Sequence, residues 1–218
     1  MLQEQIPVAR EGVPFIGLSA FVALICAILG WPVPAMAFLV LCAFILYFFR
    51  DPDRVVPHGK GLVVSPADGR VLEVTEVESA PLLAGRARRI SVFMNVFNVH
   101  VNRSPVAGTV KDISYLPGTF LPADRHRAMV QNEQNAILME DEHGNELTVV
   151  QVAGLIARRI VCRAEPGDWL RRGQRFGMIR FGSRLDCYIP LDFQVLVKAG
   201  DKTAAGETVL ARWSRENG

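Results

Sequence analysis

RISVFM, at residues 89–94, decides the fold class together with similar short runs at residues 61–64 and 70–74. Each run is rich in β-branched side chains and is separated from the next by glycine or proline turns. This pattern is typical of strands that pair antiparallel. We therefore expect the second and larger part of the chain to be mainly β.

Two internal similarities refine this expectation. Residues 65–71 (SPADGRV) resemble residues 104–110 (SPVAGTV), and residues 167–174 resemble residues 200–207. Each segment reads as a turn that feeds a strand. They are similar to the hairpins of biotinyl and lipoyl carrier domains, but the modifiable lysine of those carriers is missing. We expect a twisted antiparallel β-sandwich or barrel with carrier-like hairpins, and no carrier function.

The N-terminal part has a different composition. Residues 13–49 contain no charged side chain and form two apolar runs, each near the length that spans a bilayer. Pro32 and Pro34 lie between the runs and would break a continuous helix. We expect an α-helical membrane hairpin within residues 1–54 and a separate domain at residues 55–218.

Cations flank both outer ends of the apolar segment, namely Arg10 before it and Arg50, Arg54 and Lys60 after it. The positive-inside rule then places both ends, and the β domain, on the cytoplasmic face of the cell membrane. The same cations are also placed to meet anionic lipid headgroups. A signal peptide cleaved after Ala37 is disfavoured because hydrophobic residues resume directly after that site. A hairpin that enters only one leaflet remains open.

Charge and cysteine content exclude two further classes. The formal net charge is +2, without the clustered Lys and Arg that nucleic-acid binding requires. The four cysteines form no CxxC pair and no metal-ligand spacing, so we expect reduced packing residues and no metal site.

Five segments carry the chemistry, and the most informative one ends a strand-like run in a Gly-Ser pair. In chain order they are Ser65-Pro66-Ala67-Asp68-Gly69, residues 93–105, Asn132-Glu133, Gln151-Val152-Ala153-Gly154, and Phe181-Gly182-Ser183-Arg184. In order and approximate spacing this set resembles the phosphatidylserine decarboxylase proenzymes, and it is closest to their short prokaryotic (type A) branch.

The resemblance implies self-cleavage between Gly182 and Ser183. The Ser183 hydroxyl would attack the Gly182 carbonyl, convert the amide to an ester, and undergo β-elimination to a dehydroalanine. Hydrolysis of the dehydroalanine gives a pyruvoyl group and ammonia. Because glycine has no Cβ, the hydroxyl can approach closely. The products would be a large chain, residues 1–182, and a small chain, residues 183–218.

The resemblance also implies a charge relay for this step, since a serine hydroxyl needs a base. Asp68 matches the family's relay aspartate, and His100 matches the first histidine of its His-containing motif. Arg103 stands where longer members have a second histidine. The base therefore remains open: His100 could act in both steps, or a water molecule or His126 could contribute.

The implied reaction converts phosphatidylserine to phosphatidylethanolamine and CO2. The pyruvoyl group on Ser183 forms a Schiff base with the substrate amine and accepts the electrons released as CO2 leaves. His100 is the expected general acid. The expected partners are the phospholipid substrate, the membrane, the two chains of one precursor and a possible second copy of the protein.

Three alternatives remain open. One is a pyruvoyl decarboxylase of another serine lipid, similar to archaetidylserine, and the second is one acting on a soluble amino acid. The third is a non-enzymatic, membrane-anchored β-domain in which the Gly182-Ser183 bond stays uncut.

Overall fold

The computed structural model describes residues 7–118, 132–154, 160–180 and 183–213. The chain forms two compact units, Met1–Asp53 and Arg54–Gly218.

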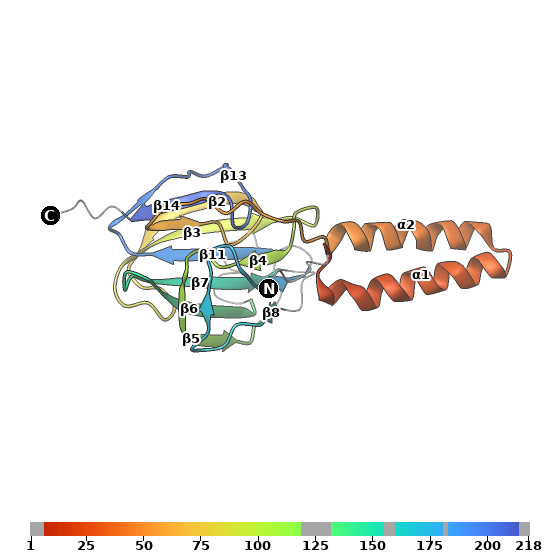
Figure 1. Ribbon diagram of the computed structural model, residues 1–218, viewed down its shortest axis with the longest axis horizontal. Coiled ribbons are helices and arrows are strands. Elements are labelled where there is room, and N and C mark those ends of the chain that lie inside the picture. The colour runs from red at the N-terminus through yellow and green to blue at the C-terminus, as the bar shows by residue number, and fades with distance from the viewer. Residues whose placement is uncertain (1–6, 119–131, 155–159, 181–182, 214–218) are drawn as a thin grey trace. The chain divides into compact units, whose positions relative to one another are not determined.

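The first unit is the expected helical hairpin. It consists of a short 3₁₀ turn, η1 (Arg10–Gly12), followed by α1 (Val13–Ile28) and α2 (Pro32–Phe48). The two helices lie side by side in Figure 1. Pro32 opens α2, where its missing N–H costs no helical hydrogen bond. The prediction of two helices broken at the prolines is confirmed.

The outer surface of the hairpin is apolar. Phe21 is 61% exposed in α1 and Val33 is 78% exposed in α2, and many other large apolar side chains are also exposed. Residues Arg10–Ile28 form one helix long and apolar enough to cross a membrane, whereas Pro32–Phe48 is slightly shorter. Exposed apolar helices of this kind are consistent with membrane association.

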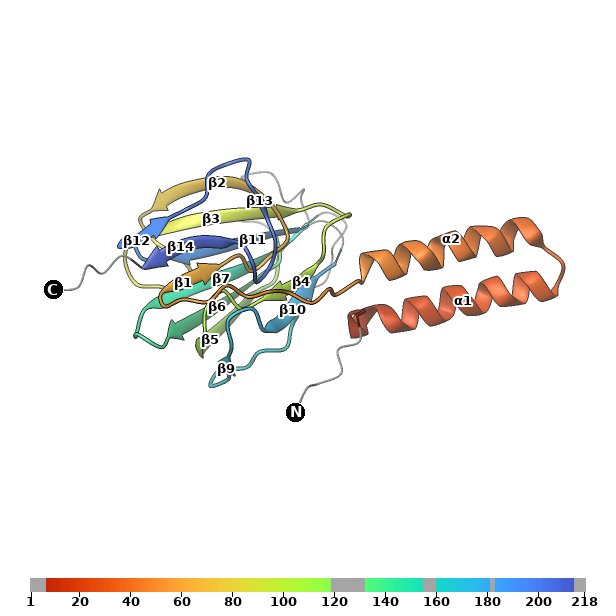
Figure 2. The same cartoon turned by 45° about the horizontal axis from the view of Figure 1, so that its top comes forward.

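The second unit is a β domain (Figure 2), and the residues of it that the structure describes form fourteen strands. They are β1 (Leu62–Val64), β2 (Gly69–Val77), β3 (Ala87–Met94), β4 (Val101–Arg103), β5 (Gly108–Leu116), β6 (Gln134–Asp141), β7 (Glu146–Ala153), β8 (Ile160–Cys162), β9 (Trp169–Leu170), β10 (Arg175–Ile179), β11 (Ser183–Ile189), β12 (Phe193–Val195), β13 (Lys202–Thr203) and β14 (Val209–Trp213).

All strand pairs are antiparallel. Eight strands form one sheet in the order β13-β2-β3-β11-β7-β6-β5-β9, and two smaller sheets have the orders β1-β14-β12 and β4-β10-β8. The main apolar core is shared by strands of all three sheets and includes Val63, Val92 and Leu185. The prediction of a mainly antiparallel β fold is confirmed.

The similar turns noticed in the sequence form the same hydrogen bonds. Ser65 Oγ donates to the carbonyl of Ala67 at 2.7 Å, and Ser104 Oγ donates to that of Val106 at 2.7 Å. At the end of the first turn, a Cβ on Gly69 would lie 2.1 Å from the Phe93 carbonyl oxygen. Gly108 is in the same situation against the next strand. Both turns therefore require glycine where a neighbouring backbone approaches closely.

The repeat extends to the whole unit. The large sheet has corresponding strands on its two sides. Read inward from one edge they are β13, β2, β3 and β11, and read inward from the other edge they are β9, β5, β6 and β7. The second half, β4 to β10, is inserted between β3 and β11 of the first. In the second half β6 and β7 are joined by a tight turn, whereas β3 and β11 are joined by the entire inserted half. The chain thus returns to the first half at Ser183.

Candidate functional site

Ser183 is the first residue of β11 and lies between two strands. Its Cα is paired with that of Met94 on β3 and that of Ala153 on β7. The residue is fully buried, and Ser183 Oγ forms no hydrogen bond within the described residues. A buried hydroxyl without a partner is costly and free to react, but the hydroxyls of Ser91 and Thr148 share this property within the described residues, so the role of Ser183 rests on its motif as well. Gly182 lies outside the described residues.

The segment before β6 supports Ala153, the neighbour of Ser183. Asn132 Nδ2 donates to the Ala153 carbonyl at 2.7 Å, and the Ala153 N–H donates to the Glu133 carbonyl at 3.0 Å. The Asn132-Glu133 motif therefore fixes the strand end next to the serine.

A buried carboxamide network lies on the same face of the sheet as Ser183. Gln151 is paired with Leu185, two residues after the serine, so strand alternation places both on one face. Gln151 Nε2 donates to Asn102 Oδ1 at 2.8 Å, and Asn135 Nδ2 donates to Gln151 Oε1 at 3.0 Å. All three carboxamides are at least 95% buried. Their mutual bonds satisfy groups that would otherwise be costly in the core.

The network reaches the neighbour of Ser183 through a weaker contact. Asn102 Nδ2 lies 3.9 Å from the sulfur of Met94, the residue paired with the serine. The network also depends on Gly177, because a Cβ there would lie 2.2 Å from the Val161 carbonyl oxygen and 3.2 Å from Gln151 Nε2. The carboxamides thus form one wall of the region around the serine.

His100 is fully buried and precedes β4, two residues before Asn102. Its Nδ1 lies 2.9 Å from the carbonyl oxygen of Asn98. A carbonyl only accepts, so Nδ1 carries the proton in this contact and Nε2 is the basic nitrogen of the neutral ring. The His100 carbonyl accepts from the N–H of Ile179 at 3.4 Å. This contact holds His100 beside the strand that leads to Ser183.

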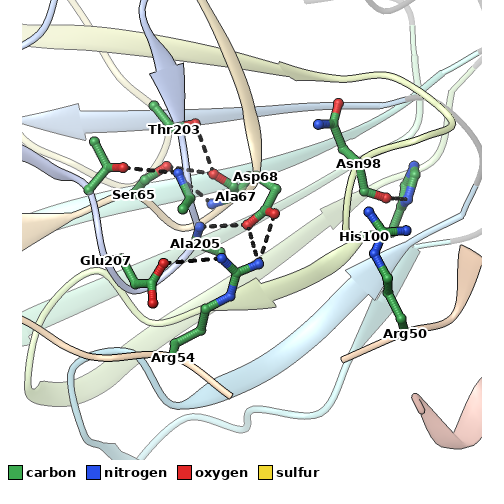
Figure 3. Close-up of polar contacts among 12 residues, drawn as sticks. Arg50, Arg54, Ser65, Ala67, Asp68, Asn98, His100, Thr203, Ala205 and Glu207 are labelled. Carbon is green, nitrogen blue, oxygen red and sulfur yellow. Dashed lines mark hydrogen bonds and ion pairs between the residues drawn. The ribbon is translucent and has the colours of Figure 1, made fainter. Parts of the chain in front are cut away.

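Asp68 lies in the turn directly before β2 and has different partners from those expected. Arg54 Nη2 lies 2.8 Å from Asp68 Oδ2 and 3.0 Å from Oδ1, and the Ala205 N–H donates to Oδ1 at 2.7 Å. Figure 3 shows Asp68 directed toward Arg54, and His100 directed toward Asn98. Within the described residues no hydrogen bond or ion pair joins Asp68 to His100 or Ser183.

Asp68 nevertheless lies at the same end of the sheet as the serine. Arg70, two residues later, is paired with Phe93 on β3, and Met94 next to it is paired with Ser183 on β11. Only β3 separates the start of β2 from the start of β11.

Arg54 also contacts a second carboxylate. Its Nη1 lies 3.2 Å from Glu207 Oε2, while the Val55 N–H donates to Glu207 Oε1 at 2.9 Å. This backbone N–H, followed by Arg54, lowers the pKa of Glu207 below its ordinary value. Only 11% of the Arg54 side chain is exposed. The expectation that Arg54 meets lipid headgroups is therefore wrong, because its guanidinium binds Asp68 and Glu207 within the second unit.

Arg103 occupies the position of the second histidine of longer relatives. It is buried, and its Nη1 donates to the carbonyl of Gly173 at 3.1 Å. Its charge also helps to lower the pKa of Glu207. A guanidinium remains protonated in proteins, so Arg103 cannot be the base.

The remaining polar groups do not suggest a metal site. Within the ranges that the structure describes, no three His, Cys, Asp or Glu side chains are grouped so that they could hold a metal ion.

Comparison with known proteins identifies the family. A model of the phosphatidylserine decarboxylase family matches residues 41–211. The phosphatidylserine decarboxylase proenzyme of Desulfotalea psychrophila is 50% identical over 212 residues, which are 97% of this chain and 99% of that protein. The proenzyme of Nitratidesulfovibrio vulgaris is 50% identical over 216 residues, 99% of both chains.

The chain belongs to the phosphatidylserine decarboxylase family. Members of this family are carboxy-lyases, and their pyruvoyl group is formed from a serine by autocatalytic cleavage. The earlier identification from five sequence segments is thus confirmed.

Ser183 fits the pyruvoyl group of this phosphatidylserine decarboxylase family. The serine is buried beside the carboxamide network of Asn102, Gln151 and Asn135. Within the described residues its Oγ forms no hydrogen bond that conversion to a pyruvoyl group would break. Pairing with β3 on one side and β7 on the other holds Ser183 in place.

Sequence reasoning missed several residues around this family site. Asn102 and Gln151 were noticed as motif members but received no role, although buried carboxamides within strands are a signal for a polar network. No local sequence pattern indicated the contacts of Arg54 with Asp68 and Glu207, because Glu207 lies 153 residues after Arg54 in the chain.

Proposed function

We propose that the chain converts phosphatidylserine to phosphatidylethanolamine and CO2 with a pyruvoyl group formed at Ser183. The position of Ser183 carries this proposal: it is a buried serine at the start of a strand, in the segment that matches the family's processing site, and its Oγ forms no hydrogen bond with any residue that the structure describes. The relatives bear the name of this enzyme and match nearly the whole chain.

In the processing step, Ser183 attacks the carbonyl of Gly182 and the chain is cut into residues 1–182 and 183–218. β11 is paired on both sides, so the serine is fixed before the cut. His100 takes the hydroxyl proton, since Nε2 is the basic nitrogen of a ring whose Nδ1 is held by Asn98. His126, the other histidine considered, lies outside the described residues.

Asp68 assists the same step as the relay carboxylate. Its side chain is bound to Arg54, so this role requires Asp68 to exchange part of that ion pair for the relay histidine. The turn itself does not need the carboxylate, because Ala107 stands at the same place in the second turn. A carboxylate that the turn does not require supports a role in the chemistry.

In decarboxylation, the pyruvoyl group supplies an electrophilic carbonyl that accepts the electrons released as CO2 departs. His100 holds and returns the proton at the substrate carbon. The network of Asn102, Gln151 and Asn135 keeps the wall of the site rigid and excludes water from it.

The membrane assignment forms part of the same proposal. α1 and α2 insert into the cell membrane, and both ends of the hairpin remain on the cytoplasmic face, since Arg10 and Arg50 flank them. A membrane-embedded substrate explains why a decarboxylase carries such a hairpin. Self-association of the protein stays a prediction.

Intact-mass analysis of the purified protein tests the cut, and CO2 release tests the substrate. We expect two masses that correspond to residues 1–182 and a pyruvoyl-headed 183–218, and a single uncut chain for Ser183→Ala. CO2 should be released from phosphatidylserine and not from free serine. An uncut wild-type chain, or equal rates on both substrates, would overturn the proposal. Faster turnover of an ether-linked archaeal serine lipid would favour that alternative.

A further inference from the structure

Several strands end at the level of Ser183, and they define one end of the large sheet. Ser183 is paired with Met94 and Ala153, the last residues of β3 and β7. Further along the sheet, Gln134 at the start of β6 is paired with Leu116, the last residue of β5. Figure 1 shows these strands one beside the next.

Large apolar side chains are exposed at this end. Phe97 lies in the turn directly after β3 and is 62% exposed, whereas Tyr115 and Leu116, at the end of β5, are 55% and 54% exposed. These side chains lie at the ends of β3 and β5, strands on opposite sides of the one that begins with Ser183, and exposed apolar groups around a reactive residue favour a binding surface. Aromatic rings in particular are favoured at the interface between water and lipid.

Two exposed cations lie at the same end. Arg70, at the start of β2, is directly paired with Lys202 on β13, and both side chains are exposed. Like charges directly opposite on neighbouring strands repel one another. Within the described ranges neither side chain forms an ion pair. An anionic partner at this surface would relieve the repulsion.

We propose that this end of the catalytic unit is a docking face for an anionic lipid bilayer, formed by Arg70, Phe97, Tyr115, Leu116 and Lys202. The proposal rests on the proposed function, because a substrate held in a bilayer must reach Ser183 at the same end of the sheet. Apolar and aromatic side chains enter the interface, and the cations meet the anionic headgroups. The docking face acts in addition to the helical hairpin.

Enzyme kinetics on two forms of the substrate test the docking face. The full-length Phe97→Ser/Leu116→Ser variant is compared with wild type on mixed phosphatidylcholine and phosphatidylserine vesicles, and on dissolved short-chain phosphatidylserine. We expect the rate at limiting vesicle concentration to fall about tenfold, while the rate on the dissolved substrate stays within about twofold. Arg70→Gln/Lys202→Gln should instead weaken the dependence on the phosphatidylserine content of the vesicles.

Trp169→Ser provides the matched control. Trp169 is 53% exposed, but it is paired with Thr109 at the opposite end of β5. Its replacement removes a larger exposed aromatic group and should leave both rates unchanged. An equal loss for Trp169→Ser, or an equal loss on both substrates for the docking-face variant, would overturn the proposal.

Amide hydrogen exchange gives a readout that does not depend on catalysis. Vesicles should protect the turn around Phe97 and leave the backbone around Trp169 unchanged. If vesicles protect the Phe97 turn but the protein releases no CO2, the docking face is supported and the proposed function is wrong. If CO2 release is normal, the turn is not protected and the variants behave like wild type, only the docking-face proposal is wrong.

Discussion

Arg54 Nη2 holds both carboxylate oxygens of Asp68, at 2.8 and 3.0 Å, and the Ala205 N–H holds one of them from the other side. In the proposed cut between Gly182 and Ser183, Arg54 and Asp68 fall in the large chain and Ala205 falls in the small chain. The Asp68 carboxylate would therefore join the two products of that cut.

Replacing Asp68 by alanine should separate its chemical role from its structural one. The fold should persist, because Ala107 forms the equivalent turn with the same serine hydrogen bond. Loss of the partly buried ion pair should cost about 1–3 kcal/mol of the free energy of unfolding. Self-cleavage should slow by about a hundredfold or more, which is the usual contribution of a group in a proton relay. Gel analysis over time and thermal melting measure the two effects.

Asp201→Ala is the control for this variant. Asp201 accepts a hydrogen bond from the Lys198 N–H within its own turn, so its loss should leave cleavage intact. Cleavage of Asp68→Ala at the rate of the control would remove Asp68 from the relay.

The His100→Ala variant should lose decarboxylation even where some cleavage persists. We expect CO2 release per cleaved chain to fall by about 10²–10⁴-fold, because a positioned general acid contributes this much. His143→Ala is the control, since His143 is exposed in the turn between β6 and β7 and stacks against Trp213 at 5.2 Å. Wild-type turnover of the cleaved His100→Ala protein would contradict its assignment.

Gln151→Leu should show how far the fold depends on the carboxamide network. The change leaves Asn102 and Asn135 without the hydrogen bonds they share with Gln151, at about 1–3 kcal/mol for each buried group. We expect a lower melting temperature and slower cleavage. Gln194→Leu, at an exposed position of β12, should change neither. Equal melting temperatures for the two variants would show that the network contributes nothing to stability.

Cys187 offers a probe of whether the small chain stays in place. Burial raises the pKa of its thiol to about 12, so the reactive thiolate is almost absent at pH 8. It is the one cysteine in residues 183–218, the proposed small chain, whereas Cys162, in the proposed large chain, is only half-buried. Maleimide should label Cys162 before Cys187, and Cys187 only after denaturant is added. Rapid labelling of Cys187 in the native cut protein would show that β11 leaves its place.

Local patterns of the sequence predicted the fold class, three of the strands and the repeated turns. The runs at residues 61–64, 70–74 and 89–94 correspond to β1, β2 and β3, because strand preference and turn residues act over short distances. The similarity of residues 65–71 and 104–110 was visible for the same reason, and it proved to mark two halves of one unit.

Contacts between distant segments could not be predicted in this way. The family resemblance implied a relay of Asp68 with Ser183 and left its base open, with His100 as one candidate. Within the described residues the structure brings Asp68 and Ser183 to one end of the sheet, and no hydrogen bond joins either of them to His100. Arg54 looked like a flanking cation of the apolar segment, and only the folded chain shows it between Asp68 and Glu207. Such contacts depend on the tertiary arrangement, which local preferences do not encode.

β11 lies in the middle of the large sheet, and this position determines the order of folding and proposed cleavage. This strand is paired along its length with β3 and with β7, so the sheet has to be complete before Ser183 is fixed for reaction. Folding must therefore come before the proposed cut. After such a cut the strands of one sheet would belong to two molecules, and refolding after denaturation would be a second-order, concentration-dependent process. The mature protein would then be protected by its rate of unfolding more than by a reversible equilibrium.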